Sequence, residues 1–179
     1  DVAQAGNAWD VSLKQNLTLL AETDYVLSFD ARSDDSRDII VGLGLDAAPW
    51  TNAVETVSLT NEWTRYTLNL TTAGFGGENN RLFFDMGAAA GQVQLDNVSL
   101  MTVSADDTGN DSSGSDNSGD MAGELLVNAG FAGADNWGGT DGMADSITDG
   151  IFSADVAQAG NAWDVSLKQN LTLLAETDY

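Results

Sequence analysis

Apolar and polar residues alternate with a period of two along most of the chain, which is the pattern of half-buried β-strands. In residues 25–32 every second side chain is apolar, so this strand is expected to bury Tyr25, Leu27, Phe29 and Ala31. Further strands are predicted at residues 9–15, 38–45, 54–59, 63–70, 81–86, 93–102, 125–131 and 151–156. No segment has helical periodicity. Short strands separated by turn signals predict an all-β fold, an antiparallel β-sandwich of the jelly-roll kind.

The chain contains one long exact duplication. Residues 1–25 return letter for letter as residues 155–179. This identity predicts a tandem array of near-identical copies, of which the chain is a window that is out of phase with the folding unit. We therefore expect residues 1–103 to form the C-terminal major part of one sandwich. Residues 123–179 would form the N-terminal part of the next copy.

Residues 104–122 consist mostly of Ser, Asp, Gly, Asn and Thr. A segment with so few apolar residues cannot offset the entropy of ordering, so we predict a flexible acidic linker.

The duplication supplies one strand twice. If residues 123–179 fold back onto residues 26–103, the first copy is displaced; if the first copy keeps its place, the second must pair with a neighbouring chain. We favour closure within one chain because loop closure costs little, whereas repeated exchange would build a filament.

The amino-acid composition excludes several classes of partner and of catalytic centre. The chain has 28 acidic and 6 basic residues and a formal net charge of -22, which would repel nucleic acids and anionic membranes, so neither partner is expected. Without His or Cys it lacks the usual zinc ligands, imidazole bases and thiol nucleophiles. A glycosidase-like pair of acids is the remaining catalytic option, but no acid lies in a recognisable motif, and we expect no enzyme. Acidity and the sequons at Asn16, Asn69 and Asn97 agree with an extracellular or cell-surface location.

Three motifs point to a family when the unit is placed in its natural order. They are LLVNAGF at residues 125–131, YVLSFDAR at 25–32 and LDNVSL at 95–100. In this order the whole unit except the linker resembles family 4 carbohydrate-binding modules. The resemblance implies a jelly roll that holds a single β-glucan chain in a groove across one sheet and performs no catalysis. We expect β-1,3-glucan ahead of β-1,4-glucan or xylan, because a bent, Trp-rich groove suits a curved chain.

A glycan groove needs aromatic rings for the flat C–H faces of sugars and planar polar groups for their hydroxyls. Positions that match the family pattern make the candidate ligand-binding set Trp137, Trp50, Gln15 and its copy Gln169, Arg81 and Asp85, with Trp9 and its copy Trp163 as a further stacking ring.

Several of these positions have alternatives. Trp50 lies beside Pro49 in the predicted loop 46–52, and its ring is expected to be exposed. Trp63 begins a strand, and its ring is expected to be buried in the core. Trp9 fits core or groove, while Arg81 and Asp85 fit a groove or ordinary surface charge. Gln15 falls on the same side of its strand as the apolar residues, so it could face a groove only if a bulge rotated its side chain outward.

The resemblance also implies a structural calcium ion held by the Asp96 carboxylate and the carbonyls of Gly130 and Gly150. The alternative for Asp96 is a turn residue beside Asn97. A second class of function stays open, in which near-identical copies form an extracellular fibre or adhesin stalk and the partners are neighbouring copies. Perfect identity between copies suggests recent expansion of a long array.

Overall fold

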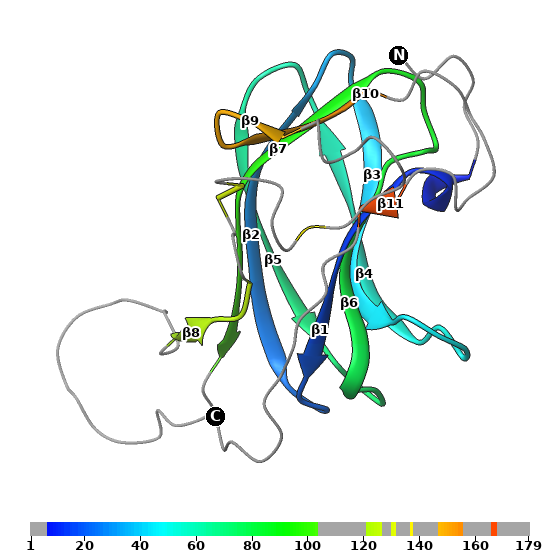
Figure 1. The fold of residues 1–179 in the computed structure, drawn as a ribbon, viewed down its shortest axis with the longest axis vertical. Helices are drawn as coiled ribbons and strands as arrows, with labels where there is room; N and C mark the ends of the chain where they lie inside the picture. Colours follow the sequence, from blue (N-terminus) through cyan, green and yellow to red (C-terminus); the bar gives the residue numbers. More distant parts are fainter. Residues whose placement is uncertain are drawn as a thin grey trace, which may run out of the picture.

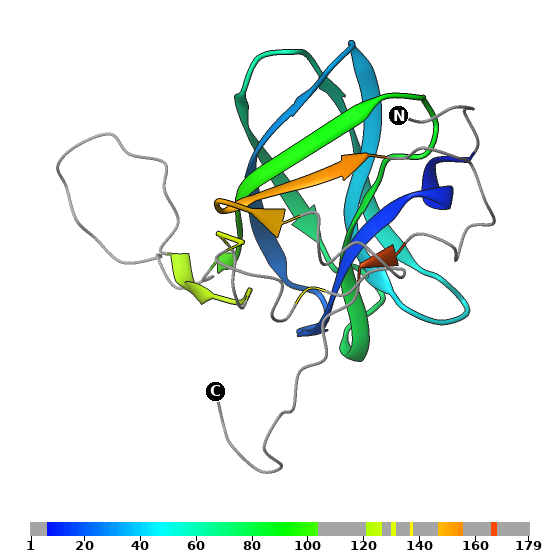
Figure 2. The same cartoon turned by 45° about the horizontal axis from the view of Figure 1, so that its top comes forward.

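The computed structural model describes residues 7–103, 121–126, 130–131, 137, 147–155 and 166–167. They form two β-sheets packed face to face, preceded by the short 3-10 helix η1 (Ala8–Asp10) (Figures 1 and 2). The predicted all-β sandwich is confirmed. Within the described ranges, no helix is long and apolar enough to cross a membrane.

The two sheets draw their strands from distant parts of the chain. Sheet A has the order β11-β1-β6-β3-β4 and contains β1 (Ser12–Leu19), β3 (Arg37–Leu45), β4 (Asn52–Leu59), β6 (Gly77–Asp85) and β11 (Ser166–Leu167). Sheet B has the order β5-β2-β7-β10-β9 and contains β2 (Asp24–Ser33), β5 (Thr64–Thr71), β7 (Gln92–Val103), β9 (Ile147–Thr148) and β10 (Ile151–Asp155), with β8 (Met121–Glu124) also paired with β7.

The core lies between the two sheets. The inward set predicted for residues 25–32 is confirmed, because Tyr25, Leu27, Phe29 and Ala31 of β2 are all buried. The ring of Phe29 reaches across to Phe84 of sheet A, edge to face, with centroids 5.1 Å apart. Burial of side chains of this size stabilises the fold by about 1.5–3 kcal/mol each.

Three strand boundaries differ clearly from the sequence prediction. β1 runs from Ser12 to Leu19, where residues 9–15 were predicted, because residues 8–10 form η1 and Leu17 and Leu19 continue the pairing with β6. β6 begins at Gly77, inside the segment expected to be a glycine-rich loop, because its first residues pair with β1 and β3. A strand was predicted over residues 125–131, but β8 covers Met121–Glu124 and ends before that range begins. Leu125 still donates its backbone N–H to the Leu100 carbonyl, and Leu126 is buried, so these residues follow β7 without extending the strand.

Segments that follow the predicted linker complete sheet B. One side of β7 pairs with β2, and the other pairs with β10 through Phe152 and Leu95 and with β8 through Glu124 and Met101. β8 begins at Met121, within the predicted linker, and the rest of that linker, residues 104–120, lies outside the described residues. The chain therefore supplies its own strands to the second edge of β7.

The duplicated strand has an arrangement that neither sequence alternative foresaw. β1, from the first copy, pairs antiparallel with β6, while β10 pairs with β7 in the same chain. β11, from the second copy, pairs parallel with β1 and sets Ser166 beside Ser12 and Leu167 beside Leu13, its own counterparts. The sandwich thus takes the first copy of the strand together with β8, β9 and β10, and the second copy adds β11 to the edge of β1.

Candidate functional site

The alternation of β6 builds a polar strip on the outer face of sheet A. Leu82 and Phe84 of this strand are fully buried between the sheets, so Arg81, Phe83 and Asp85 project from the opposite face. Arg81 and Asp85 are four residues apart, or about 13 Å along a strand, and Phe83 lies between them. The neighbouring strands place Asn16, Lys14 and Ser12 of β1 beside these three residues in turn.

Arg81 lies at one end of this strip and is the residue that several neighbouring side chains contact. Its guanidinium forms a 2.7 Å ion pair with Asp46, which comes from the loop after β3, and Lys14 lies 3.4 Å from the same carboxylate oxygen. The guanidinium also lies 5.0 Å from the ring centroid of Phe83 and 5.4 Å from that of Trp50, both within cation–π range. Five residues from three segments are thereby held in one cluster, which we call the Arg81 cluster.

Trp50 is the exposed member of the Arg81 cluster, with 53% of its surface accessible. Its backbone has a φ of +60°, a left-handed conformation that is unfavourable for a bulky residue. Hydrogen bonds hold the turn: Trp50 N–H donates to the Ala47 carbonyl at 2.9 Å, and the Asn52 amide donates to the Trp50 carbonyl at 3.0 Å. The loop thus presents the ring on a fixed support, as the sequence predicted.

Asp85 stands at the other end of the strip and is nearly buried, with 9% exposure. Burial raises the pKa of this carboxyl above its ordinary value, while a hydrogen bond from Ser12 and the charges of Arg81 and Lys14 act to lower the pKa. The carboxyl therefore lies in a partly desolvated environment, where a hydrogen bond from a ligand would be strengthened.

Two glycines of β3 allow β4 to approach closely beside the strip. Gly42 and Gly44 of β3 pair with Phe83 and Arg81, respectively. A Cβ atom at Gly42 would lie 2.3 Å from the Ala53 carbonyl oxygen of β4, so no side chain fits there without movement of the backbone. The space beside these glycines is therefore already taken by β4, through Val54 next to Gly42 and Asn52 next to Gly44.

Polar atoms beneath this surface lack internal partners. Among the described residues, Arg81 Nε and Asn16 Oδ1 are buried and accept or donate no hydrogen bond within the chain. Buried polar groups are normally hydrogen-bonded, and a hydroxyl can both donate and accept. Asn16 and Arg81 are paired in the β1–β6 register, so the Arg81 end of the strip holds two polar atoms without a hydrogen-bond partner among the described residues.

Two of the predicted groove residues, Trp137 and Gln15, are buried in the interior, so the prediction that they line an open groove is wrong. Trp137 is 4% exposed, and its ring lies 4.9 Å from that of the fully buried Phe131. Gln15 is fully buried on the inner side of sheet A, where it pairs with Leu82. The β1–β6 register is regular from Ser12 to Leu17, so no bulge rotates Gln15 outward.

The other tryptophans give mixed outcomes. Trp9 is 57% exposed in η1, which is tied to the Asp85 end of β6 by a hydrogen bond from Gly87 N–H to the Ala8 carbonyl. Trp63 was expected in the core but is 38% exposed, because it precedes β5 and its ring lies against Arg32 on the outside of sheet B. The predicted residues Trp163 and Gln169 lie outside the described residues.

The three residues expected to hold calcium come from neighbouring segments. Gly150 has a φ of +80°, and a Cβ atom built on it would lie 3.4 Å from the Gly130 carbonyl oxygen. Asp96 of β7 lines a pocket with Ile151, the residue after Gly150, and accepts a 2.6 Å hydrogen bond from Asn97 N–H. Within the described part of the chain, no cluster of three or more His, Cys, Asp or Glu side chains could hold a metal ion.

Sequence reasoning missed four members of this site: Phe83, Lys14, Asp46 and Asn16. The alternation already placed Phe83 on the same face as Arg81 and Asp85, which was the available signal. Asp46 carried no such signal, because its contact with Arg81 joins residues 35 positions apart.

Comparisons with known proteins give a family match and matches to solved structures. A family model described as a carbohydrate binding domain, CBM_4_9, matches residues 1–91. A solved structure described as "CBM4 structure and function" matches with a TM-score of 0.52 and 29% identity, covering 56% of this chain and 66% of that chain. Another, described as "Family 16 Carbohydrate Binding Module-2", has 21% identity and a TM-score of 0.37, covering 50% of this chain and 67% of that chain. A search of curated protein sequences gives no match.

Proposed function

The chain belongs to the CBM_4_9 family of carbohydrate binding domains, and from this premise we propose that it binds one β-glucan chain across the outer face of sheet A, without catalysis. The family match over residues 1–91 includes β1, β3, β4 and β6, which form that face. The observation that carries the proposal is the Arg81 cluster, where a charged group, a buried ring and the exposed ring of Trp50 meet. An extracellular or cell-surface location is part of the proposal and is supported by the net charge of -22.

The cluster suits a neutral polyhydroxyl ligand. Trp50 offers a flat apolar face for a pyranose ring. Asp46 and Asp85 are offset by Arg81 and Lys14, so these four groups carry no net charge and favour neither an anion nor a cation. Their donors and acceptors can take the hydroxyls at the rim of the sugar ring.

We place β-1,3-glucan ahead of β-1,4-glucan and xylan. Trp50 and Trp9 are both exposed, and they stand near opposite ends of β6, at the Arg81 end and the Asp85 end. A chain in contact with both rings would run from the Arg81 end to the Asp85 end of β6, and we expect a curved glucan to follow the twist of the sheet over this length.

Affinity electrophoresis through gels that contain laminarin, hydroxyethylcellulose or xylan tests the proposal. The chain should be retarded most by laminarin, and Trp50→Ala should abolish most of that retardation. Leu20→Ala is the matched control, because Leu20 is 65% exposed in the turn after β1, apart from the Arg81 cluster. Equal mobility in the presence and absence of all three glycans would overturn the proposal.

We also propose that calcium binds the Asp96 carboxylate and the carbonyls of Gly130 and Gly150. The approach of Gly130 to Gly150 supports this, since both donors are oxygens, which calcium prefers, and the ion would tie the segment before β10 to β7. Because it would bind only the folded chain, the melting temperature should be higher in calcium than in chelator. Asp96→Ala should remove the difference; a difference of the same size in this variant would exclude Asp96.

A second candidate function is that of a structural repeat in a fibre or adhesin. The pairing of β11 with β1 supports it, because the edge of β1 accepts a strand of its own sequence in register. In an array the same edge could take that strand from a neighbouring copy. Light scattering before and after deletion of residues 156–179 tests this: assemblies that disperse on deletion would support exchange, and monomers in both samples would eliminate it.

A further inference from the structure

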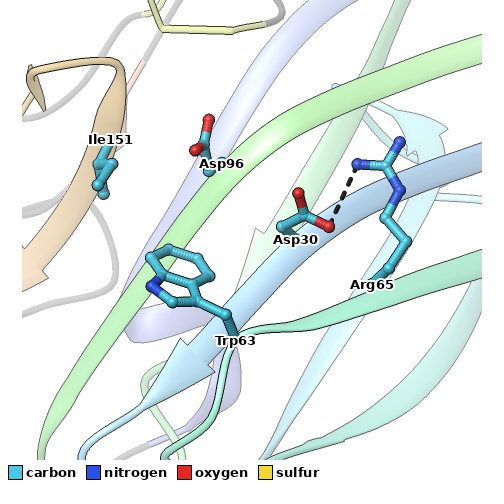
Figure 3. A pocket seen from close by; sticks show the side chains of 5 residues that line it. All are labelled: Asp30, Trp63, Arg65, Asp96 and Ile151. Carbon is cyan, nitrogen blue, oxygen red and sulfur yellow. Dashed lines mark ion pairs between the residues drawn. The ribbon is translucent and has the colours of Figure 1, made fainter.

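A second concave surface lies on the outer face of sheet B, the sheet that does not carry the Arg81 cluster. Its pocket has a volume of about 350 Å³ and is lined by Asp30, Trp63, Arg65, Asp96 and Ile151 (Figure 3). These residues come from β2, β5 and the turn before it, β7 and β10, which are consecutive neighbours in the sheet. The volume falls at the lower end of the range for small-molecule sites.

The polar side of the pocket is held in place by several hydrogen bonds. Arg65 Nη1 lies 3.3 Å from an Asp30 carboxylate oxygen and donates to the Asn97 carbonyl at 2.9 Å, while Nη2 donates to Ser28 Oγ at 2.8 Å. The Asn97 amide donates to the second oxygen of Asp30 at 2.8 Å. Since both partners of Asp30 are fixed in turn, its carboxylate is oriented before any ligand arrives.

The aromatic side of the pocket is held just as firmly. The Arg32 guanidinium lies 4.9 Å from the ring centroid of Trp63, and Arg32 Nε donates to Gln94 at 2.7 Å. Gln94 in turn donates to Ser153 Oγ of β10 at 2.9 Å. Trp63 keeps 38% of its surface exposed, and Figure 3 shows its ring beside Asp30 and Asp96 at the pocket.

The charges select the class of ligand. Asp30 and Asp96 are balanced by Arg65 and Arg32, and the chain as a whole is strongly acidic, so an anionic ligand is disfavoured. Asp30 already has a guanidinium partner, which disfavours a cation. Among the described residues, Asp96 accepts a hydrogen bond at one carboxylate oxygen only, from Asn97 N–H, so its other oxygen can accept from a hydroxyl.

We infer that this pocket is a second saccharide-binding site, in which Trp63 stacks on one sugar ring and Asp30 and Asp96 accept its hydroxyls. A pocket of this size fits a monosaccharide, a disaccharide or the end of a chain, whereas sheet A presents an open strip for the interior of a chain. The two sites lie on opposite faces of the sandwich, so one molecule could contact two glycan chains. The inference does not depend on the function proposed for sheet A.

Isothermal titration with laminaribiose and cellobiose tests the second site on the Trp50→Ala variant, in which the sheet A site is weakened. We expect this variant to bind at least one disaccharide, and addition of Trp63→Ala to weaken that binding about tenfold or more. Trp63→Phe, which keeps an aromatic face, should retain part of the affinity. Titrations are run with calcium and with chelator, because Asp96 is also a proposed calcium ligand.

The outcomes separate the two sites. If Trp50→Ala binds neither disaccharide, or if Trp63→Ala leaves its affinity unchanged, the second site does not exist. If instead Trp50→Ala binds laminarin as tightly as the unmodified chain does and the added Trp63→Ala weakens this binding, the sheet A proposal fails while the second site stands. Circular dichroism checks that each variant is folded, and chemical-shift changes of the Trp63 indole on titration provide a readout that loss of stability would not mimic.

Discussion

Replacing Trp50 separates glycan stacking from backbone strain. In Trp50→Ala the ring is lost while the residue keeps a side chain at a φ of +60°, and in Trp50→Gly the ring is lost and the left-handed conformation becomes unstrained. If the ring stacks on the ligand, the two variants should lose the same affinity. If the loop conformation matters instead, they should differ.

The structure sets the expected magnitudes. A stacking ring at the centre of a site contributes about 1–3 kcal/mol, which is a loss of about 5- to 150-fold in affinity for either variant. Because Trp50 is 53% exposed and its main described contact is with Arg81, Trp50→Ala should lower the free energy of unfolding by only about 0.5–1 kcal/mol. A left-handed non-glycine residue costs about 1–2 kcal/mol, partly offset by the greater backbone freedom of glycine in the unfolded chain. Trp50→Gly should therefore be the more stable variant by about 1 kcal/mol, or about 2–4 °C in Tm.

Titration calorimetry with a laminarin oligosaccharide and scanning calorimetry of the same samples measure both quantities. Binding within about twofold of the unmodified chain in both variants would refute the stacking role. A loss of stability above about 3 kcal/mol in Trp50→Ala would show that the ring is a core residue, since that is the cost of truncating a buried Trp.

Three further predictions follow from the same surface. Arg81→Lys keeps the charge but not the planar fork, so it should reduce glycan affinity about fivefold or more in the same titration; unchanged affinity would exclude a role for the guanidinium geometry. The raised pKa of Asp85 means that the fold favours the neutral carboxyl, so the contribution of Asp85 to the free energy of unfolding should be greatest below its ordinary pKa and fall as pH rises through the raised one. Asp85→Asn cannot ionise, and its stability relative to the unmodified chain should therefore grow from pH 3 to pH 7 in thermal melts; a difference that does not change with pH would contradict this. Gly42→Ala should lower Tm measurably, because its Cβ would press on the Ala53 carbonyl, and a melt identical to that of the unmodified chain would show that β3 and β4 separate freely.

The sequence by itself determined the class of fold and the face of each regular strand. In β2, Tyr25 and Phe29 are inward as predicted, because successive side chains of an extended chain point to opposite sides, whatever packs against them. The same rule placed Arg81, Phe83 and Asp85 together on one face. Motif order also indicated the family that the later comparison found.

Tertiary structure decided which rings are displayed and which charges meet. Trp137 and Trp63 are both aromatic residues near turns, yet contact with Phe131 buries the first, and a position outside sheet B exposes the second. Arg81 meets Asp46 and Trp50 only because strand register brings distant segments together, and register is a property of pairing between strands. The place of the duplicated strand is the clearest case: residues 1–25 and 155–179 are identical, so no local preference distinguishes them, and only the connections to β2 and β10 determine which copy pairs with β6.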